Sequence, residues 1–148
     1  MNIRKFLLLI STTFLFFSCR STITKNTQPD FSGNWQTHSF IIENVYQQIA
    51  ISEITFEKIK GTAYSFYGNS GVNTFFGDAI IKNNSIQISS NMGSTKMAGP
   101  TEAMEFEDLF LACLSTADKI ELTEENNSEI LSIKNTALNS EIRFTKEP

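Results

Sequence analysis

Short runs of alternating hydrophobic and polar residues dominate the chain after residue 30, with Gly or Asn between many of the runs. Such alternation is typical of antiparallel strands with one buried face. Two Asn pairs, Asn83-Asn84 and Asn126-Asn127, predict a tight hairpin and a second, slightly longer one, because Asn tolerates positive φ. The pattern predicts eight strands: Gly33–Phe40, Ile49–Glu57, Thr62–Tyr67, Phe75–Lys82, Ser85–Ser89, Lys119–Thr123, Glu129–Ile133 and Glu141–Thr145.

The segment from Pro100 to Ala117 breaks this alternation. Its apolar residues recur at intervals of three and four, which indicates a helix with one apolar stripe. Pro100 suits the first helical position and Gly99 can cap it. The stripe consists of Ala103, Phe106, Phe110, Cys113, Leu114 and Ala117. The acidic residues expected on the wet and dipole-facing sides of the helix are Glu102, Glu105, Glu107 and Asp108. The predicted fold is α+β and mostly β.

The amino-terminal segment has the three parts of a secretory signal. Arg4 and Lys5 precede a twelve-residue apolar run, Phe6–Phe17, which is followed by the small residue Ser18. A membrane-spanning helix needs about 20 apolar residues, so a permanent span is disfavoured. We expect this signal peptide, residues 1–18, to be removed.

The residues at the end of the signal, Leu15-Phe16-Phe17-Ser18-Cys19, resemble a lipobox, where lipoprotein signal peptidase cuts before a cysteine that carries lipid. Phe16 stands where leucine is usual and keeps the apolar character of that position. We therefore expect lipidation of Cys19 in a bacterial cell envelope. The alternative is an ordinary secreted protein in which Cys19 is incidental.

The polar residues after Cys19 predict a flexible tether, so that residues 19–30 link the lipid to a domain at 31–148. Arg20 is not the aspartate linked with inner-membrane retention in some enteric bacteria, which favours the outer membrane. The sequence does not indicate which side of the membrane the domain faces, nor its oligomeric state.

Charge restricts the possible partners. Loss of the signal leaves ten basic against sixteen acidic residues, a net charge of −6, with no Lys/Arg cluster in the sequence. Such a chain repels phosphate backbones, so no nucleic-acid partner is expected, and anionic lipid headgroups are poor partners too. Attachment is expected through the acyl chains on Cys19.

Few residues offer chemistry. His38 is the only histidine, and a hydrolytic enzyme built on it would need an orienting carboxylate that no motif supplies. We interpret His38 as a solvated strand residue and Cys113 as a buried, inert thiol of the helical stripe. No cysteine and histidine spacing for zinc and no calcium loop occurs, so no catalytic, metal or cofactor site is predicted.

Two sequence blocks resemble the META domain family, which includes the HslJ-like heat-shock lipoproteins of bacterial envelopes. The first matches Gly-Cys-Asn-Arg-Phe-x-Gly, and the second matches Ser-Thr-Arg-Met-Ala-Cys-Pro and the helix after it. A further match is the opening Gly-x-Trp strand. The matching positions, which we interpret as structural, are Trp35, Gly71, Asn73, Phe76, Gly77, Ser94, Thr95, Lys96, Met97, Ala98 and Pro100.

The resemblance implies a bent antiparallel sheet, partly closed into a barrel, with one packed helix. The family is known by association with stress, antibiotic tolerance and virulence, and no enzymatic reaction is established for it in general. Val72 and Gly99 stand where the family often has cysteines, so both partners of a family disulfide are absent.

The sequence favours a binding or interaction domain that holds an envelope protein or a small apolar ligand. The alternatives are a hydrolytic enzyme using His38 and a purely structural envelope component. On a helical wheel Met104 and Leu111 fall together, away from the apolar stripe. Either other parts of the chain cover these two residues, or they form an exposed strip that contacts a partner.

Overall fold

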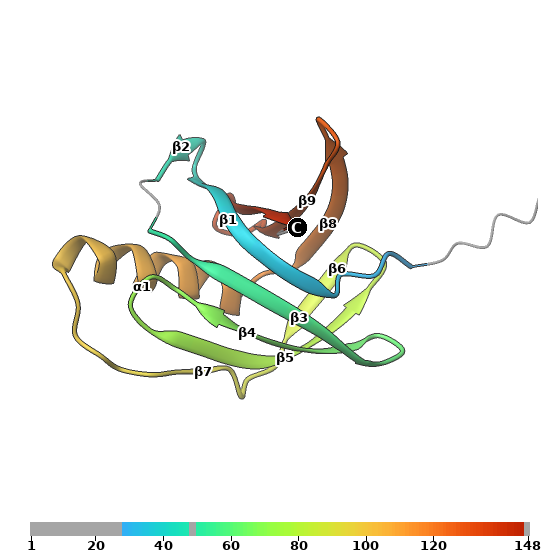
Figure 1. Ribbon diagram of the computed structural model, residues 1–148, viewed down its shortest axis with the longest axis horizontal. Coiled ribbons are helices and arrows are strands. Elements are labelled where there is room, and N and C mark those ends of the chain that lie inside the picture. Colours follow the sequence, from blue (N-terminus) through green and yellow to red (C-terminus); the bar gives the residue numbers. More distant parts are fainter. Residues whose placement is uncertain (1–27, 48–49, 147–148) are drawn as a thin grey trace, which may run out of the picture.

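The computed structural model describes residues 28–47 and 50–146. Within this part of the chain, ten strands form one antiparallel sheet, and a single helix packs against it (Figure 1). The elements are β1 (Gly33–Ile42), β2 (Val45–Tyr46), β3 (Glu53–Lys60), β4 (Ala63–Asn69), β5 (Thr74–Lys82), β6 (Ser85–Ile88), β7 (Gly93–Ser94), α1 (Thr101–Ser115), β8 (Lys119–Glu125), β9 (Ser128–Asn135) and β10 (Ser140–Lys146).

Eight of these strands form a closed ring of hydrogen bonds, in the order β10-β9-β8-β6-β5-β4-β3-β1, because β1 also pairs with β10. The pairing of β6 with β8 is the weak point, with the single register pair Ser85–Lys119. The sheet is therefore strongly bent and partly closed, as expected, and is not a regular barrel. The eight ring strands are the eight that the sequence predicts.

The two additional strands are short and lie outside the ring. β2 pairs with the end of β1 through a turn in which Glu43 and Asn44 have φ of 50° and 66°. β7 pairs with the start of β5. Two residues are too few for an alternating pattern, which explains why the sequence did not predict them.

Most observed boundaries lie within a few residues of the predicted ones. β3 begins at Glu53, whereas the strand was predicted from Ile49, which lies outside the described residues. The hairpin at Asn126-Asn127 was predicted to be slightly longer than the one at Asn83-Asn84, and this prediction is wrong. Only these two residues lie between β8 and β9, with φ of 51° and 63°. Its tight form matches the right-handed twist of the strands.

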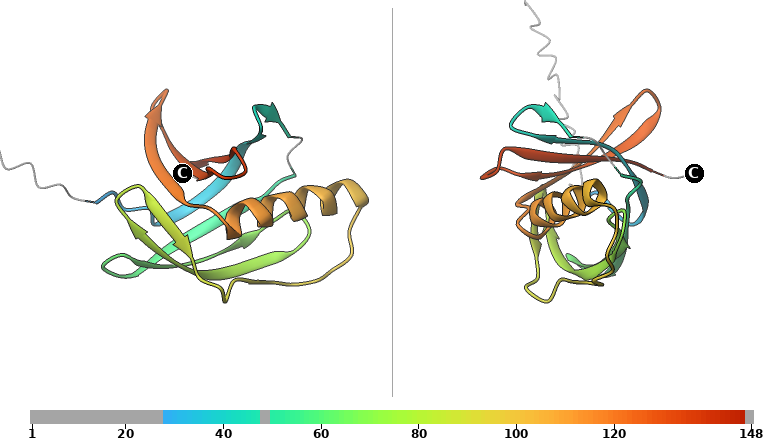
Figure 2. Two further views of the ribbon diagram at one scale, coloured as in Figure 1. Left: turned by 180° about the vertical axis from the view of Figure 1, so that it is seen from behind. Right: turned by 90° about the vertical axis from the view of Figure 1, so that its left-hand side faces the viewer.

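The helix begins one residue later than predicted and ends two residues earlier. Pro100 is its N-cap residue, with φ −56° and ψ 143°, rather than its first helical residue, and Gly99 does not cap it. The helix lies along the inner face of the bent sheet (Figure 2). Its Phe106 and Phe110 rings meet the ring of Phe40 edge-on, and Phe110 also packs against Phe75 and Phe144. These contacts form the centre of the core.

The amino-terminal predictions fall outside the described residues: the signal peptide, Cys19 and the tether as far as residue 27. The described chain is already in contact with the domain at Gln28, whose side-chain amide donates to the carbonyl of Ile81 at 2.7 Å. No helix within residues 28–47 and 50–146 has the length and apolar character needed to cross a membrane.

Candidate functional site

The carboxylate of Glu107 lies at the centre of the site, on the face of α1 that packs against the sheet. Glu107 is 4% exposed, so the prediction that it lies on a wet side of the helix is wrong. Helical spacing accounts for its burial, since Ala103, Phe110 and Leu114 lie four before, three after and seven after it. The other acidic residues of the helix are exposed as expected: Glu102, Glu105 and Asp108.

Three donors from the turn between β4 and β5 reach this carboxylate. The hydroxyl of Ser70 donates to Oε2 at 2.6 Å, and the backbone N–H of Asn73 donates to the same oxygen at 2.8 Å. The side-chain amide of Asn73 donates to Oε1 at 2.7 Å. A buried carboxylate needs such partners to offset its lost hydration. The three bonds therefore join the middle of α1 to the β4–β5 turn.

Asn73 extends this network to the segment between β7 and α1. Its Oδ1 accepts hydrogen bonds from the backbone N–H of Met97 at 2.6 Å and from the hydroxyl of Thr95 at 2.8 Å. Its Nδ2 donates to the Met97 carbonyl at 3.2 Å as well as to Glu107. The side chain thus makes all four hydrogen bonds available to an amide. Asn73 connects three segments that are far apart in the sequence.

Local backbone geometry places these donors. Gly71 has a φ of +107°, which favours glycine, and its N–H donates to the Asn69 side-chain carbonyl at 2.7 Å. A Cβ at position 71 would also lie 2.9 Å from the Cβ of Ala50. A larger residue at this position would therefore displace the turn that carries Ser70 and Asn73.

Electrostatics keep Glu107 ionised despite its burial. Desolvation alone would raise the pKa of Glu107. Hydrogen bonds from the side chains of Ser70 and Asn73, and from the backbone N–H groups of Asn73 and Val72, outweigh that effect and hold the pKa below its ordinary value. The site is therefore a buried, compensated negative charge.

The two positions at which the family often has cysteines lie side by side. A Cβ built on Gly99 would lie 2.7 and 2.9 Å from the two Cγ atoms of Val72, and 3.4 Å from its Cβ. The absence of a side chain at Gly99 leaves the room that the branched side chain of Val72 occupies. The two blocks thus meet at Val72 and Gly99, where neither residue is a cysteine.

Several other family-motif positions have well-defined contacts. Trp35 is fully buried and donates from Nε1 to the Phe31 carbonyl at 3.0 Å. A Cβ at Gly77 would lie 2.7 Å from the ring of Phe66. The aromatic side chain of Phe76 is 56% exposed on the outer face of β5. Ser94 pairs with Phe75 in the β5–β7 ladder. The motif positions Lys96 and Ala98 are exposed, and nothing in the structure explains their identity.

Sequence reasoning missed Ser70 and Glu107, although one signal for Glu107 was present. Its helical position falls on the apolar stripe, where an acidic residue is unusual enough to indicate a buried partner. Ser70 precedes the first family block directly and has no comparable signal, because a serine before a glycine is ordinary turn composition.

The structure places the residues considered for catalysis apart from this network. His38 is exposed on β1, where the register with β10 shifts between Thr37 and Ser39. In the described part of the chain, no three His, Cys, Asp or Glu side chains converge to form a metal site.

Cys113 is buried, with 1% exposure, as predicted. Burial raises the pKa of its thiol, and the hydrogen bond with the Ser140 hydroxyl, 3.0 Å away, opposes that effect. A protonated, enclosed thiol is a poor nucleophile at neutral pH.

Met104 and Leu111 are both half-buried, which is intermediate between the two outcomes considered for them. Leu111 packs against the core cluster from outside. It also lines a shallow surface pocket of about 270 Å³ between α1 and the chain around β7, together with Met92, Gly93, Ser94, Ala112 and Ser115.

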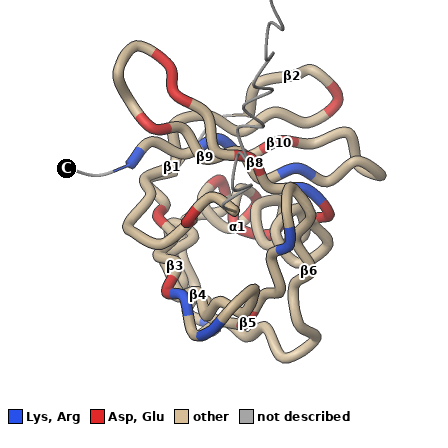
Figure 3. The backbone as a smooth tube through the Cα atoms, turned by 90° about the vertical axis from the view of Figure 1, so that its right-hand side faces the viewer, with Lys and Arg blue, Asp and Glu red and all other residues tan. Residues whose placement is uncertain are grey.

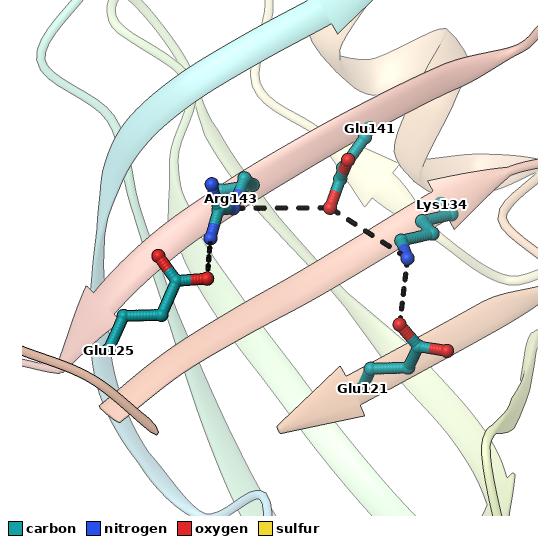
Figure 4. A network of polar contacts seen from close by, with 5 residues as sticks. All are labelled: Glu121, Glu125, Lys134, Glu141 and Arg143. Carbon is teal, nitrogen blue, oxygen red and sulfur yellow. Dashed lines mark hydrogen bonds and ion pairs between the residues drawn. The ribbon is translucent and has the colours of Figure 1, made fainter. Parts of the chain in front are cut away.

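A second polar network covers the outer face of β8, β9 and β10 (Figure 4). Lys134 forms ion pairs with Glu121 at 2.7 Å and Glu141 at 3.9 Å, and Arg143 pairs with Glu125 and Glu141. The hydrogen bond with Lys134 lowers the pKa of Glu121, and the same bond raises that of Lys134. These residues are partly exposed, so the network contributes little stability per pair.

The fold and the site together define a small β domain in which a buried carboxylate and asparagine join a helix to a bent sheet. The META domain model matches residues 30–147, and the chain belongs to the META domain family. A solved structure described as the NMR structure of the protein from Burkholderia xenovorans is similar, with a TM-score of 0.65 at 16% identity, covering 78% of this chain and 82% of that one. The likeness is one of fold. A search of curated protein sequences finds no significant relative.

Proposed function

We propose that this protein is a lipid-anchored envelope component whose META domain acts as a non-enzymatic binding module. The signal at residues 1–18 and the lipobox-like residues before Cys19 support the anchor. The polar residues that follow support a short tether that holds the domain near the membrane, with the outer membrane as its site. A role in stress or antibiotic tolerance accords with the associations of the family.

The observation that carries the non-enzymatic part of the proposal is the saturated network around Glu107. Its members are polar residues of the kind that catalytic sites use, yet Asn73 makes four side-chain hydrogen bonds and Glu107 receives bonds on both oxygens. A carboxylate held in this way stays deprotonated, and its oxygens accept hydrogen bonds from the protein rather than from a substrate. This accords with a structural role for the family-motif positions.

Binding through the half-buried Met104 and Leu111 is the second part of the proposal. Both residues leave apolar surface accessible on α1, and the shallow pocket beside Leu111 adds a concave apolar contact. An envelope protein that presents a small hydrophobic side chain fits such a surface.

The anchor is tested with the full-length protein in cells. Wild-type protein should incorporate labelled fatty acid and sediment with membranes, whereas Cys19→Ala should lose the label and accumulate as precursor or as released protein. Cys113→Ala is the matched control, because its buried thiol is not the lipid-bearing residue. Unchanged labelling and sedimentation of Cys19→Ala would refute the anchor.

The non-enzymatic assignment is tested by incubating purified protein with generic esterase and phosphatase substrates. We expect rates equal to those of a His38→Ala variant and of buffer. Turnover that disappears in His38→Ala would support the hydrolytic alternative in place of the binding module.

A further inference from the structure

The described chain enters the domain beside the ends of three strands. Gln28 donates to the carbonyl of Ile81 near the end of β5, and the N–H of Ile81 donates to the carbonyl of Thr62 at the β3–β4 turn, at 2.8 Å. Eight residues separate Cys19 from Gln28, and a polar coil of that length spans roughly 16 Å. A lipid on Cys19 would therefore keep this end of the domain close to the bilayer.

Exposed lysines gather at this end, although they are separated in the sequence. Lys58 and Lys60 lie on β3 near its turn, and Lys82 lies on β5 immediately after Ile81. Lys60 pairs in register with Ala63, which in turn pairs with Ile80. None of the three lysines forms an ion pair with a carboxylate of the described residues, whose ion pairs involve Lys134, Arg143 and Lys146.

Two exposed isoleucines lie among these lysines. Ile59, between Lys58 and Lys60, is 63% exposed where the β3–β4 register shifts, and Ile80 is 46% exposed on the outer face of β5. We name these five residues the tether-side patch: Lys58, Ile59, Lys60, Ile80 and Lys82. Apolar side chains flanked by lysines suit a membrane surface, where the ammonium groups reach phosphates and the isoleucines enter the interface.

Carboxylates also lie near these lysines: Glu57 precedes Lys58 on β3, Asp78 lies two residues before Ile80 on β5, and Asp118 and Glu121 line a surface pocket with Lys82. Figure 3 faces this end of the domain, with Lys and Arg in blue. Asp30, the carboxylate near Lys58, accepts bonds from the N–H and hydroxyl of Ser32, which with Lys58 hold its pKa below the ordinary value. The charged residues between Cys19 and Gln28 are Arg20 and Lys25, both basic. The amino-terminal half of α1, at the opposite end in Figure 1, exposes Glu102, Glu105 and Asp108.

We propose that the tether-side patch rests on the headgroups of an anionic phospholipid bilayer and orients the domain, with α1 directed away from the membrane. The proposal rests on the lipid anchor proposed above, and adds a headgroup contact that the net charge of the chain argued against. The three lysines without ion pairs supply the attraction, and the exposed carboxylates of α1 at the opposite end act only over about 10 Å at moderate salt.

The test uses full-length lipidated protein in phosphatidylcholine vesicles with and without phosphatidylglycerol. A bimane probe is attached in Ile59→Cys, or in the control Glu105→Cys on α1, and a phospholipid with a nitroxide on its headgroup serves as quencher. Labelling is specific, since Cys113 is buried and Cys19 carries the lipid. We expect quenching at position 59 to exceed that at 105 by about threefold in the anionic vesicles, and to fall at high salt.

Charge reversal provides the second arm. Lys60→Glu with Lys82→Glu should reduce quenching at position 59 to the level at 105, whereas Lys96→Glu, an exposed lysine outside the patch, should leave it unchanged. Equal quenching at 59 and 105 in vesicle-bound protein would overturn the orientation and leave the anchor standing. Quenching at position 59 that changes neither with phosphatidylglycerol content nor with charge reversal would overturn the headgroup contact. Protein that never joins the vesicles would overturn the anchor and this orientation with it.

Discussion

Asn73 binds Glu107 twice, through its backbone N–H to one carboxylate oxygen and through its side-chain amide to the other, at 2.8 and 2.7 Å. The pair joins the β4–β5 turn to the middle of α1, and it also fixes the segment before α1 through Met97 and Thr95. Both side chains are nearly inaccessible. Three of the four predictions below follow from this pair and its immediate surroundings.

Removal of the buried carboxylate should destabilise the domain strongly. Glu107→Ala leaves Ser70 and Asn73 donors buried without a partner, at a cost of about 3 kcal/mol or more in the free energy of unfolding. Urea unfolding of the purified protein measures this change. Glu105→Ala, two residues away on an exposed position of the same helix, should remain within about 0.5 kcal/mol of wild type. Equal effects of the two substitutions would contradict the assignment.

The same carboxylate predicts acid sensitivity. Because the pKa of Glu107 in the folded state is lowered, its ionised form stabilises the fold above the unfolded-state pKa of about 4.3. That contribution is lost as pH falls through the lower, folded-state pKa. Other carboxylates with lowered pKa add to the acid response, so the measurement is the difference in unfolding free energy between wild type and Glu107→Gln. The difference should shrink as pH falls below 4; a constant difference down to about pH 2 would refute this linkage.

The contact between Val72 and Gly99 predicts a disulfide in the double variant Val72→Cys with Gly99→Cys. A Cβ built on Gly99 would lie 3.4 Å from the Cβ of Val72, which is close to the Cβ separation of known disulfides. Closing this loop should stabilise the oxidised domain by about 3 kcal/mol. Thermal melting with and without reductant measures the gain, and wild type should melt identically under both conditions. Gly99→Cys alone should destabilise, because its side chain meets Val72.

Replacement of Met104 and Leu111 by Ser separates two roles for these residues. As a contact surface, they can be changed with a loss below about 1 kcal/mol, while crosslinks to an envelope partner in cells disappear. As part of the core, they would cost several kcal/mol. Crosslinks that survive in a stable double variant would eliminate the proposed strip.

The predictable part of the fold is the part with periodic hydrophobicity. The eight ring strands bury alternate residues, and α1 buries residues spaced three and four apart. Both patterns are therefore visible in the sequence. The two-residue strands β2 and β7 form because neighbouring strands present free edges to them, a condition set by tertiary structure. The start of α1 is also set by tertiary structure. Asn73 forms two hydrogen bonds with Met97, which fix the extended segment that ends at Pro100, so the helix begins only after this residue.

The sequence identified some residues of the site but not the hydrogen bonds that connect them. The family blocks identify Asn73 and Thr95, yet nothing local shows that Asn73 reaches α1, 34 residues further along the chain. Glu107 was assigned to solvent because its charge outweighed its position on the stripe. The lysines of the tether-side patch were missed for a related reason: net charge is a sum over the whole chain, and it does not show where individual lysines lie on the folded domain.

The pairing of β1 with β10 has a consequence for when the domain can fold. β1 is the first strand of the ring and β10 the last, and their ladder extends from Trp35–Lys146 to Ile42–Ser140. The sheet therefore cannot close until nearly the final residue of the chain is available, and pairings this distant in sequence form slowly. During synthesis the growing chain lacks the partner of its first strand and stays open. Under the export proposed above, such a delay would keep the polypeptide unfolded while it crosses the membrane.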